Sequence, residues 1–225
     1  MVFTAAPAAE KTPDKSLVIL FVTSGNELVG KNETAMIVDA FRDLGFKLEF
    51  RRVPLARGAQ EISNENIDGE LVRVREYGDT HPDLIRVEEP IAKVYFSIYA
   101  KRGAEVPCSW KELLGSKLRI DFQRGIHYFE MNLKDYVSTR VESIDTPMQM
   151  FQRLQSSRSD VFLLDRQSAD NVIAKSPKKW NVERVCDLHV SPAYMYLKKT
   201  HAELAGKLPE LFRKHRKPGA GGNAD

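Results

Sequence analysis

The chain has 225 residues, of which 42% are hydrophobic, so it can bury one substantial core or two small ones. Its 34 basic and 31 acidic side chains are interspersed and leave a net charge of +3, which argues against a dedicated nucleic-acid surface. No apolar run approaches the roughly 20 residues that a membrane helix needs. We therefore expect a globular monomer that is not membrane-embedded, binds no nucleic acid and takes a small or anionic ligand.

The first half of the chain alternates predicted strands and helices. Strands are expected at residues 17–23 and 47–53, and helices at residues 33–43 and 56–64. The first helix repeats apolar residues at helical spacing, and Gly45 follows as a natural stop.

A second alternating block begins at Ser109, which forms a capping-box pattern with Glu112 before a short helix that ends at Gly115. The rest of this block is predicted as strands at residues 118–122, 140–144 and 161–164, and helices at residues 128–135 and 148–154.

Two aromatic, β-rich segments lie at the boundaries of the blocks, where the chain is expected to cross from one block to the other. They are Val94–Ala100 and Ala193–Lys199. A last helix is expected to start at Thr200, which forms a second capping-box pattern with Glu203. The chain has no internal repeat of fixed period. Two α/β blocks of similar size joined by two crossings predict two lobes with a cleft between them.

Both ends of the chain are predicted to lie outside this core. Residues 1–16 place alanines and a proline before charged residues and lack the apolar core of a signal peptide. We expect them to form a flexible lead that remains after export or cloning. Residues 219–225 are expected to form a loose tail.

Several short motifs follow one another in the order of a known family. In the first block they are Pro54-Leu55-Ala56-Arg57, the stretch from Asn64 through Asp68-Gly69 to Arg73, and Pro82–Val87. In the second block they are Ser109–Leu113, Gln123–Gly125, Arg158–Phe162 and Ala193–His201. By the order and spacing of these motifs over residues 17–217, the chain resembles family 3 periplasmic solute-binding proteins. The stretch between Thr23 and Lys31 is shorter than in the amino-acid binders of that family.

The resemblance implies an α/β, two-lobed type 2 periplasmic-binding-protein fold with two crossing hinge strands and a ligand cleft between the lobes. It assigns residues 17–95 and 197–218 to lobe 1 and residues 96–196 to lobe 2. The implied function is capture of a small polar, carboxylate-bearing or amino-acid-like solute by hinge closure, in the periplasm, for the permease of an ABC transporter. The alternative is a ligand-sensing domain or orphan binder that feeds a signalling partner.

Arg73 ends a predicted strand just after the Asp68-Gly69 turn, and α/β sheets place ligands at the carboxyl ends of strands. A guanidinium there can hold a carboxylate through two parallel hydrogen bonds. The alternative is a structural pairing with Asp68 or Glu70. In the amino-acid binders that the chain resembles, the carboxylate-binding arginine lies a few residues further on.

Gly125 stands at a predicted strand-to-helix turn, where backbone N–H groups and the positive end of a helix can receive an anion. Arg124, His127 and Tyr128 flank this glycine and complete the predicted anion cradle. The alternative is an ordinary tight turn that requires glycine, with His127 as a surface or core residue.

The resemblance places Asp165 where amino-acid binders carry an aspartate that binds the ligand ammonium. Asp165 can instead pair with Arg166 or cap a helix that begins at Gln167. Arg57 either points into the cleft or lies against the acidic end of a neighbouring element. Five aromatic residues of the crossing segments either stack on a ligand or fill the hinge core: Tyr95, Phe96, Tyr99, Tyr194 and Tyr196.

The chain has no Gly-x-Ser-x-Gly elbow, phosphate loop or paired-histidine metal motif, so we expect no catalytic residue, metal or cofactor. The rival class is an enzyme on the same architecture, such as a dehydratase, which would recruit Glu130 and His127 as acid and base.

Cys108 and Cys186 are too few for a disulfide framework and lack metal-site spacing with the histidines. The resemblance implies that the two crossing segments run antiparallel side by side, with Ser97 near Tyr196. Both cysteines then lie in the same direction from the crossing and can approach the ~6 Å Cα separation of a disulfide. An exported protein would oxidise the pair, whereas a cytosolic one would keep both thiols free.

Overall fold

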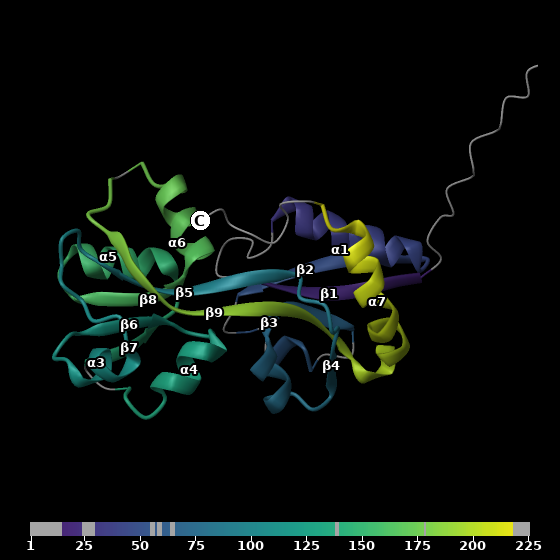
Figure 1. Cartoon of the computed structure of the whole chain (residues 1–225), viewed down its shortest axis with the longest axis horizontal. Helices are drawn as coiled ribbons and strands as arrows, with labels where there is room; N and C mark the ends of the chain where they lie inside the picture. The colour runs from purple at the N-terminus through teal and green to yellow at the C-terminus, as the bar shows by residue number, and fades with distance from the viewer. Residues whose placement is uncertain are drawn as a thin grey trace, which may run out of the picture.

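The computed structural model describes residues 15–23, 30–54, 57, 60–63, 66–137, 140–177 and 179–217. The predicted N-terminal lead up to residue 14, the C-terminal tail and much of the predicted helix at residues 56–64 lie outside these described residues. Residues 15 and 16, predicted as the end of the lead, instead begin the first strand of the sheet. Figure 1 shows an elongated molecule of two lobes joined by long strands. No described helix is long and apolar enough to cross a bilayer.

One mixed sheet runs through both lobes in the strand order β2-β1-β3-β9-β5-β8-β6-β7, with β4 paired to β9. The strands are β1 (Lys15–Thr23), β2 (Phe46–Pro54), β3 (Gly69–Val74), β4 (Leu84–Arg86), β5 (Ala92–Ala100), β6 (Ile120–Gln123), β7 (Val141–Ile144), β8 (Val161–Asp165) and β9 (Glu183–Lys198). Within each lobe the strands that alternate with helices pair in parallel, whereas β5 and β9 pair antiparallel to each other. The predicted α/β class with two crossing strands is confirmed.

Helices cover the sheet on both lobes. They are α1 (Lys31–Asp43), α3 (Trp110–Gly115), α4 (His127–Leu133), α5 (Pro147–Gln155), α6 (Arg166–Lys175) and α7 (Ala202–His215), with the 3-10 helices η1 (Arg75–Thr80) and η2 (Lys199–His201). In the second lobe, α5 and α6 lie on one side of the strands and α3 and α4 on the other (Figure 1).

Each lobe has its own apolar core. In the first lobe, Phe41 of α1 and Phe212 of α7 are fully buried against the sheet. In the second lobe, Phe129, Phe151 and Phe162 from three different elements are fully buried together. The amphipathic spacing of α1 and α7 therefore gives the packing that helical periodicity predicts.

One of the two predicted capping boxes is confirmed and the other is wrong. The Ser109 hydroxyl accepts a hydrogen bond from the Glu112 amide at 3.3 Å and caps α3. Thr200, by contrast, lies inside η2, and α7 begins at Ala202 with His201 as its N-cap residue. His201 Nε2 lies 2.8 Å from the Asp68 carboxylate, and this contact fixes the entry of the chain into α7 in place of the predicted cap.

The second crossing strand is much longer than the sequence predicts. β9 extends back from the expected segment to Glu183, and two register shifts interrupt its pairing with β5. Ser97 therefore lies opposite Asp187, and the predicted pairing of Ser97 with Tyr196 is wrong. Tyr196 pairs instead with Glu70 of β3. The shifts break the apolar alternation over residues 183–190, which removes the usual sequence pattern of a strand.

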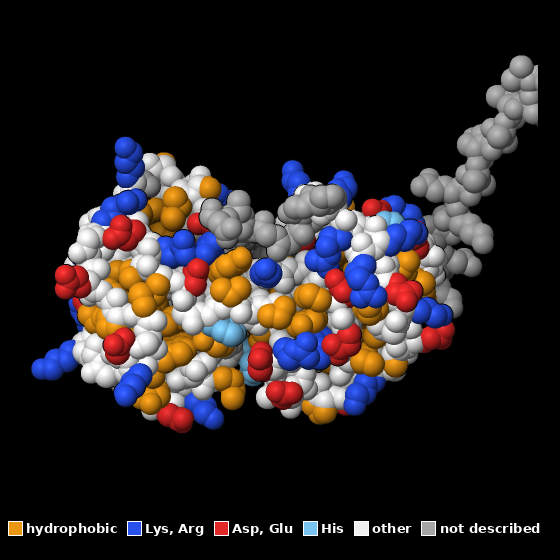
Figure 2. Space-filling model, viewed as in Figure 1, with side chains coloured by type: hydrophobic (Ala, Val, Ile, Leu, Met, Phe, Trp, Pro, Cys, Tyr) orange, Lys and Arg blue, Asp and Glu red, His pale blue; other side chains and the backbone are white. Residues whose placement is uncertain are grey.

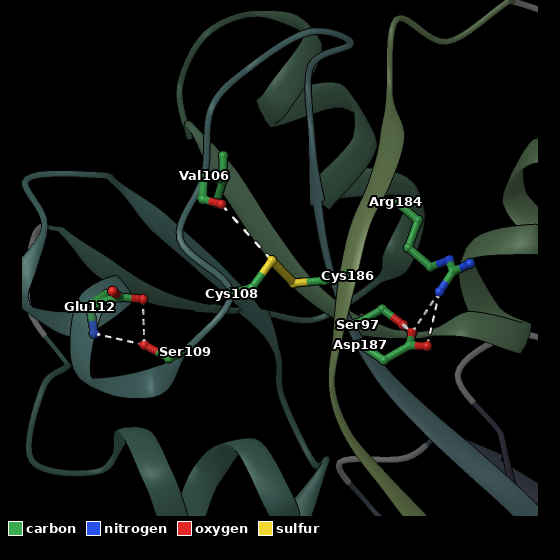
Figure 3. The surroundings of a disulfide bond; sticks show 8 residues. All are labelled: Ser97, Val106, Cys108, Ser109, Glu112, Arg184, Cys186 and Asp187. Atoms are coloured by element: carbon green, nitrogen blue, oxygen red, sulfur yellow. Dashed lines mark hydrogen bonds and ion pairs between the residues drawn. A yellow bond between two sulfur atoms is a disulfide. The ribbon is translucent and has the colours of Figure 1, made fainter.

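The sequence left open whether Cys108 and Cys186 pair, and the structure joins them in a disulfide with a Cα separation of 6.2 Å (Figure 3). Cys186 sits on β9 opposite Ile98, beside the hydrogen bond of 2.6 Å that the Ser97 hydroxyl donates to Asp187. The pairing follows from the antiparallel run of β5 and β9, although the register differs from the expected one. The bond ties the segment before α3 to the second crossing strand.

We expect the double variant Cys108→Ser/Cys186→Ser to lose roughly 2–4 kcal/mol of unfolding free energy, because the 78-residue separation closes a long loop in the unfolded chain. Urea unfolding of the variant and of the wild type, with and without reductant, measures this loss. Reductant should destabilise the wild type alone. Two free thiols in the denatured, unreduced wild type would contradict the disulfide.

Candidate functional site

A cavity of about 50 Å³ lies where the first-lobe strand β3 meets the second lobe. Its walls come from β3, from β5, from the turn between β6 and α4 together with the first two residues of α4, and from the end of β8. The lining residues are Val72, Arg73, Val74, Val94, Phe96, Gly125, Ile126, His127, Tyr128 and Asp165. Five of the seven residues singled out from the sequence are thus brought together: Arg73, Gly125, His127, Tyr128 and Asp165. On the face shown in Figure 2, the molecule narrows between the lobes and histidine side chains lie at this waist.

Arg73 is bound to a carboxylate of its own strand. Its Nη2 donates to Oε1 of Glu70, whose side chain is fully buried, while the Arg73 side chain is 7% exposed. Burial by itself lowers the pKa of Arg73, and the adjacent Glu70 carboxylate outweighs burial and raises it, so the guanidinium stays charged. The guanidinium carbon also lies 4.4 Å from the centre of the Tyr77 ring.

A bulge at Val72 makes this pairing possible. Residues three apart on a regular strand point to opposite faces, so Glu70 and Arg73 could not meet. The pairing of β3 with β9 shifts register between them, and Val72 has a φ of +63°. That conformation is costly for a β-branched residue, on the order of 1–3 kcal/mol. The strain therefore sits directly beside the Arg73 side chain and on the cavity wall.

Gly125 is hydrogen-bonded through its backbone amide to a carboxylate of the protein itself. Its φ of +85° lies in the left-handed region that favours glycine, which agrees with the tight-turn reading. Its backbone N–H donates to the carboxylate of Glu130 at 2.6 Å. The amide that the sequence offers as an anion cradle is therefore occupied by the protein itself.

His127 forms a contact between the lobes. Its ring meets the Tyr77 ring edge-on at 6.2 Å, and Tyr77 in turn stacks on His81 at 3.8 Å. Burial lowers the pKa of His127, and the nearby His81 and Arg73 act in the same direction, whereas Glu130 opposes them. Neutral His127 is therefore favoured near pH 7.

Aromatic rings form one wall of the cavity. Phe96 of β5 stacks on Tyr128 at 4.6 Å, and Tyr128 stacks on His189 at 4.8 Å. The Tyr128 hydroxyl accepts a hydrogen bond of 2.9 Å from Trp110 Nε1. Of the five aromatic residues of the crossing segments, Phe96 lines the cavity, and one face of its ring is covered by Tyr128.

Asp165 is 3% exposed and caps α6, where its Oδ1 accepts the Ser168 amide at 2.8 Å. The predicted capping role is confirmed, although α6 begins at Arg166 and not at Gln167, and Arg166 pairs with Asp187 in place of Asp165. Burial raises the pKa of the Asp165 carboxyl, while the hydrogen bonds from Ser168 oppose that rise. Asp165 is both a helix cap and a cavity-lining acid.

Arg124 and Arg57 lie outside the cavity. Arg124 points along the surface of the second lobe, where it pairs with Asp145 at 2.9 Å and the two side chains are 50% and 61% exposed. Arg57 is exposed. In both cases an outward side chain accounts for the difference from the predicted ligand contact.

Several cavity residues carry no functional pattern in the sequence. Val72, Val74, Val94 and Ile126 read as ordinary core or strand residues. Glu70 enters the sequence argument only as a structural partner of Arg73. Glu70 reaches the Arg73 guanidinium only because of the bulge at Val72, and the periodicity of the sequence does not predict that bulge.

Other parts of the described surface give weaker support for a binding site. A hollow of about 360 Å³ on the second lobe is lined by polar side chains, and its Arg153 is already bound to Asp121 at 2.7 Å and to Glu142 at 3.0 Å. Among the described residues, no group of three or more His, Cys, Asp or Glu side chains is arranged to hold a metal ion. We take the cavity between the lobes as the candidate binding site because it gathers five of the residues singled out from the sequence.

We expect Arg73→Met to lose about 3–5 kcal/mol of unfolding free energy, because it leaves the Glu70 carboxylate buried without its cation. The double variant Glu70→Gln/Arg73→Met should recover most of that loss. Urea unfolding measures both, with Arg124→Ala as an exposed control that should change stability by less than about 0.5 kcal/mol. An Arg73→Met protein as stable as the wild type would show that the pair is not structural.

Comparison with known proteins yields a fold but no family. No family model matches the chain. A protein of Shewanella oneidensis described as uncharacterized is 24% identical over 183 residues, which cover 80% of this chain and 69% of the relative.

Solved structures give a closer likeness in three dimensions. The holo form of ArgBP from T. maritima has a TM-score of 0.69 at 16% identity, covering 90% of this chain and 91% of that one. An ancestral arginine-binding protein bound to arginine has a TM-score of 0.69 at 18% identity, covering 91% and 94%. A histidine kinase sensor domain with similarity to periplasmic binding proteins has a TM-score of 0.70 at 14% identity, covering 91% of both chains. At these identities the likeness shows the fold, which is that of a two-lobed periplasmic binding protein.

Proposed function

We propose that this chain is an extracytoplasmic solute-binding protein that captures a small polar, amino-acid-like solute in the cavity between its lobes. One observation carries the proposal: five residues chosen from the sequence as ligand contacts line a single cavity, although they come from both lobes and from three separate parts of the chain. The likeness to arginine-binding proteins supports a binding role for the fold.

Capture requires the lobes to move. The cavity encloses about 50 Å³ in this structure, whereas ligand pockets usually enclose roughly 300–1,000 Å³. We assign residues 17–95 and 197–218 to one moving lobe and residues 96–196 to the other. Bending of β5 and β9 opens the cavity, and closure on the solute presents a new surface to a membrane partner.

The partner in this proposal is the permease of an ABC transporter. A signalling partner is the second candidate, because the histidine kinase sensor domain has as high a TM-score as the binding proteins. An adjacent permease and ATPase gene would favour uptake, and an adjacent kinase or cyclase gene would favour sensing. The disulfide supports an extracytoplasmic location for either role.

The enzyme alternative has weaker support. Its two candidate groups were Glu130 and His127, but the Glu130 carboxylate is held by the Gly125 amide at 2.6 Å. The solved structures that the chain resembles are named for binding or sensing. A reversible binding site is therefore the better account of the cavity.

A thermal-shift screen over amino acids, organic acids and amines tests capture. A ligand present at 100 times its Kd stabilises the folded state by about 2.7 kcal/mol, which raises the Tm of a chain of this size by roughly 5–10 °C. Arg124→Ala should keep this shift and Asp165→Asn should lose most of it. The absence of any shift across the screen, or turnover of a compound that binds, would contradict the proposal.

Small-angle scattering with the compound that gives the largest shift tests hinge closure. We expect a smaller radius of gyration at saturating ligand, because the two lobes come together around it. A radius that stays the same at saturation would mean that the ligand binds without closing the cleft.

A further inference from the structure

The buried pair of Arg73 and Glu70 bears on which solute the cavity accepts. An arginine recognises a ligand carboxylate by offering two parallel N–H donors. One terminal nitrogen of Arg73 already donates to Glu70, and both side chains are almost wholly removed from water. A ligand carboxylate on the same guanidinium would place a second negative charge beside Glu70 in a site that is almost wholly removed from water.

Acidic groups accompany Arg73 at the cavity. Among the described residues, Arg73 is the one lysine or arginine that lines it, and Glu70 is paired with its guanidinium. Glu130 of α4 lies close enough to raise the pKa of Arg73, and Asp165 at the end of β8 lines the same cavity. His127, with its lowered pKa, adds no positive charge near neutral pH. Burial raises the pKa of the Asp165 carboxyl, so a cationic nitrogen beside it would favour its ionised form, whereas a ligand carboxylate would add a further negative group.

The uncharged part of the wall suits such a cation. The rings of Phe96 and Tyr128 stand beside the Asp165 carboxylate on the cavity wall, and aromatic faces attract ammonium groups. Three valines and Ile126 line the rest of the wall and match a hydrocarbon chain. Arg73 Nε, which is buried without a partner, offers one further donor for a neutral ligand oxygen.

We propose that Glu70 occupies the place of a ligand carboxylate on Arg73, so that the site selects amines over the amino acids that contain the same side chain. Glu70 is then a specificity-determining residue. This inference rests on the proposed capture function and narrows its solute class to small organic cations without a carboxylate.

Binding of matched pairs by calorimetry tests the inference: agmatine against arginine, cadaverine against lysine, and tyramine against tyrosine. The wild type should bind the amine of at least one pair ten or more times tighter than its amino acid. Glu70→Gln removes the internal carboxylate while keeping its shape, so it should shift that ratio at least tenfold toward the amino acid. Glu88→Gln changes an exposed glutamate paired with Arg86 and should leave the ratio unchanged.

The outcomes separate the two proposals. A wild type that binds amino acids tenfold tighter than the amines would overturn the selectivity and leave capture intact. A Glu70→Gln protein that folds but keeps the wild-type ratio would remove Glu70 from specificity. If none of the six compounds binds the wild type, the selectivity for amines is overturned, and the wider thermal-shift screen then decides on capture. If Glu70→Gln fails to fold, the wild-type ratios decide on their own.

Discussion

The antiparallel pairing of β5 with β9 is the constraint on which the rest of the structure depends. It extends from Ala92 opposite Ala193 to Ala100 opposite Glu183, so one sheet passes through both lobes. The same pairing brings Cys186 within reach of Cys108, and the other edge of β5 pairs with β8 and sets Phe96 beside Asp165. Backbone hydrogen bonds along two strands can bend without breaking, and they therefore join the lobes while allowing a hinge.

A second constraint is local and lies on the other side of the cavity. The bulge at Val72 turns Arg73 toward Glu70 and places a strained residue on the cavity wall. Such strain persists only where the surroundings hold it, and it is common at binding sites. Here the buried ion pair and the pairing of β3 with β9 hold the bulge, so the fold of the first lobe and the charge of the site are linked.

This link changes how the site is best understood. Each predicted anion-binding group, the Arg73 guanidinium and the Gly125 amide, is already engaged by a glutamate of the chain. The protein thus supplies its own anions, while Asp165 remains a buried acid on the cavity wall. These pairings are the reason for proposing a cation in the cavity in place of the carboxylate that Arg73 alone would suggest.

The sequence by itself determined the alternation of strands and helices and the two crossing segments, because local periodicity and turn chemistry encode them. It pointed as well to five of the cavity residues, four from strand ends and turns and Asp165 from the family resemblance. It also supplied the two cysteines, although their pairing needed the antiparallel crossing. Tertiary structure alone decided the length and register of β9, the entry into α7 at His201 and the contact of Glu70 with Arg73. These features depend on bulges and on long-range contacts. A bulge lets residues meet that would lie on opposite faces of a regular strand, and a long-range contact joins residues far apart in the chain. Neither produces a periodic pattern in the sequence.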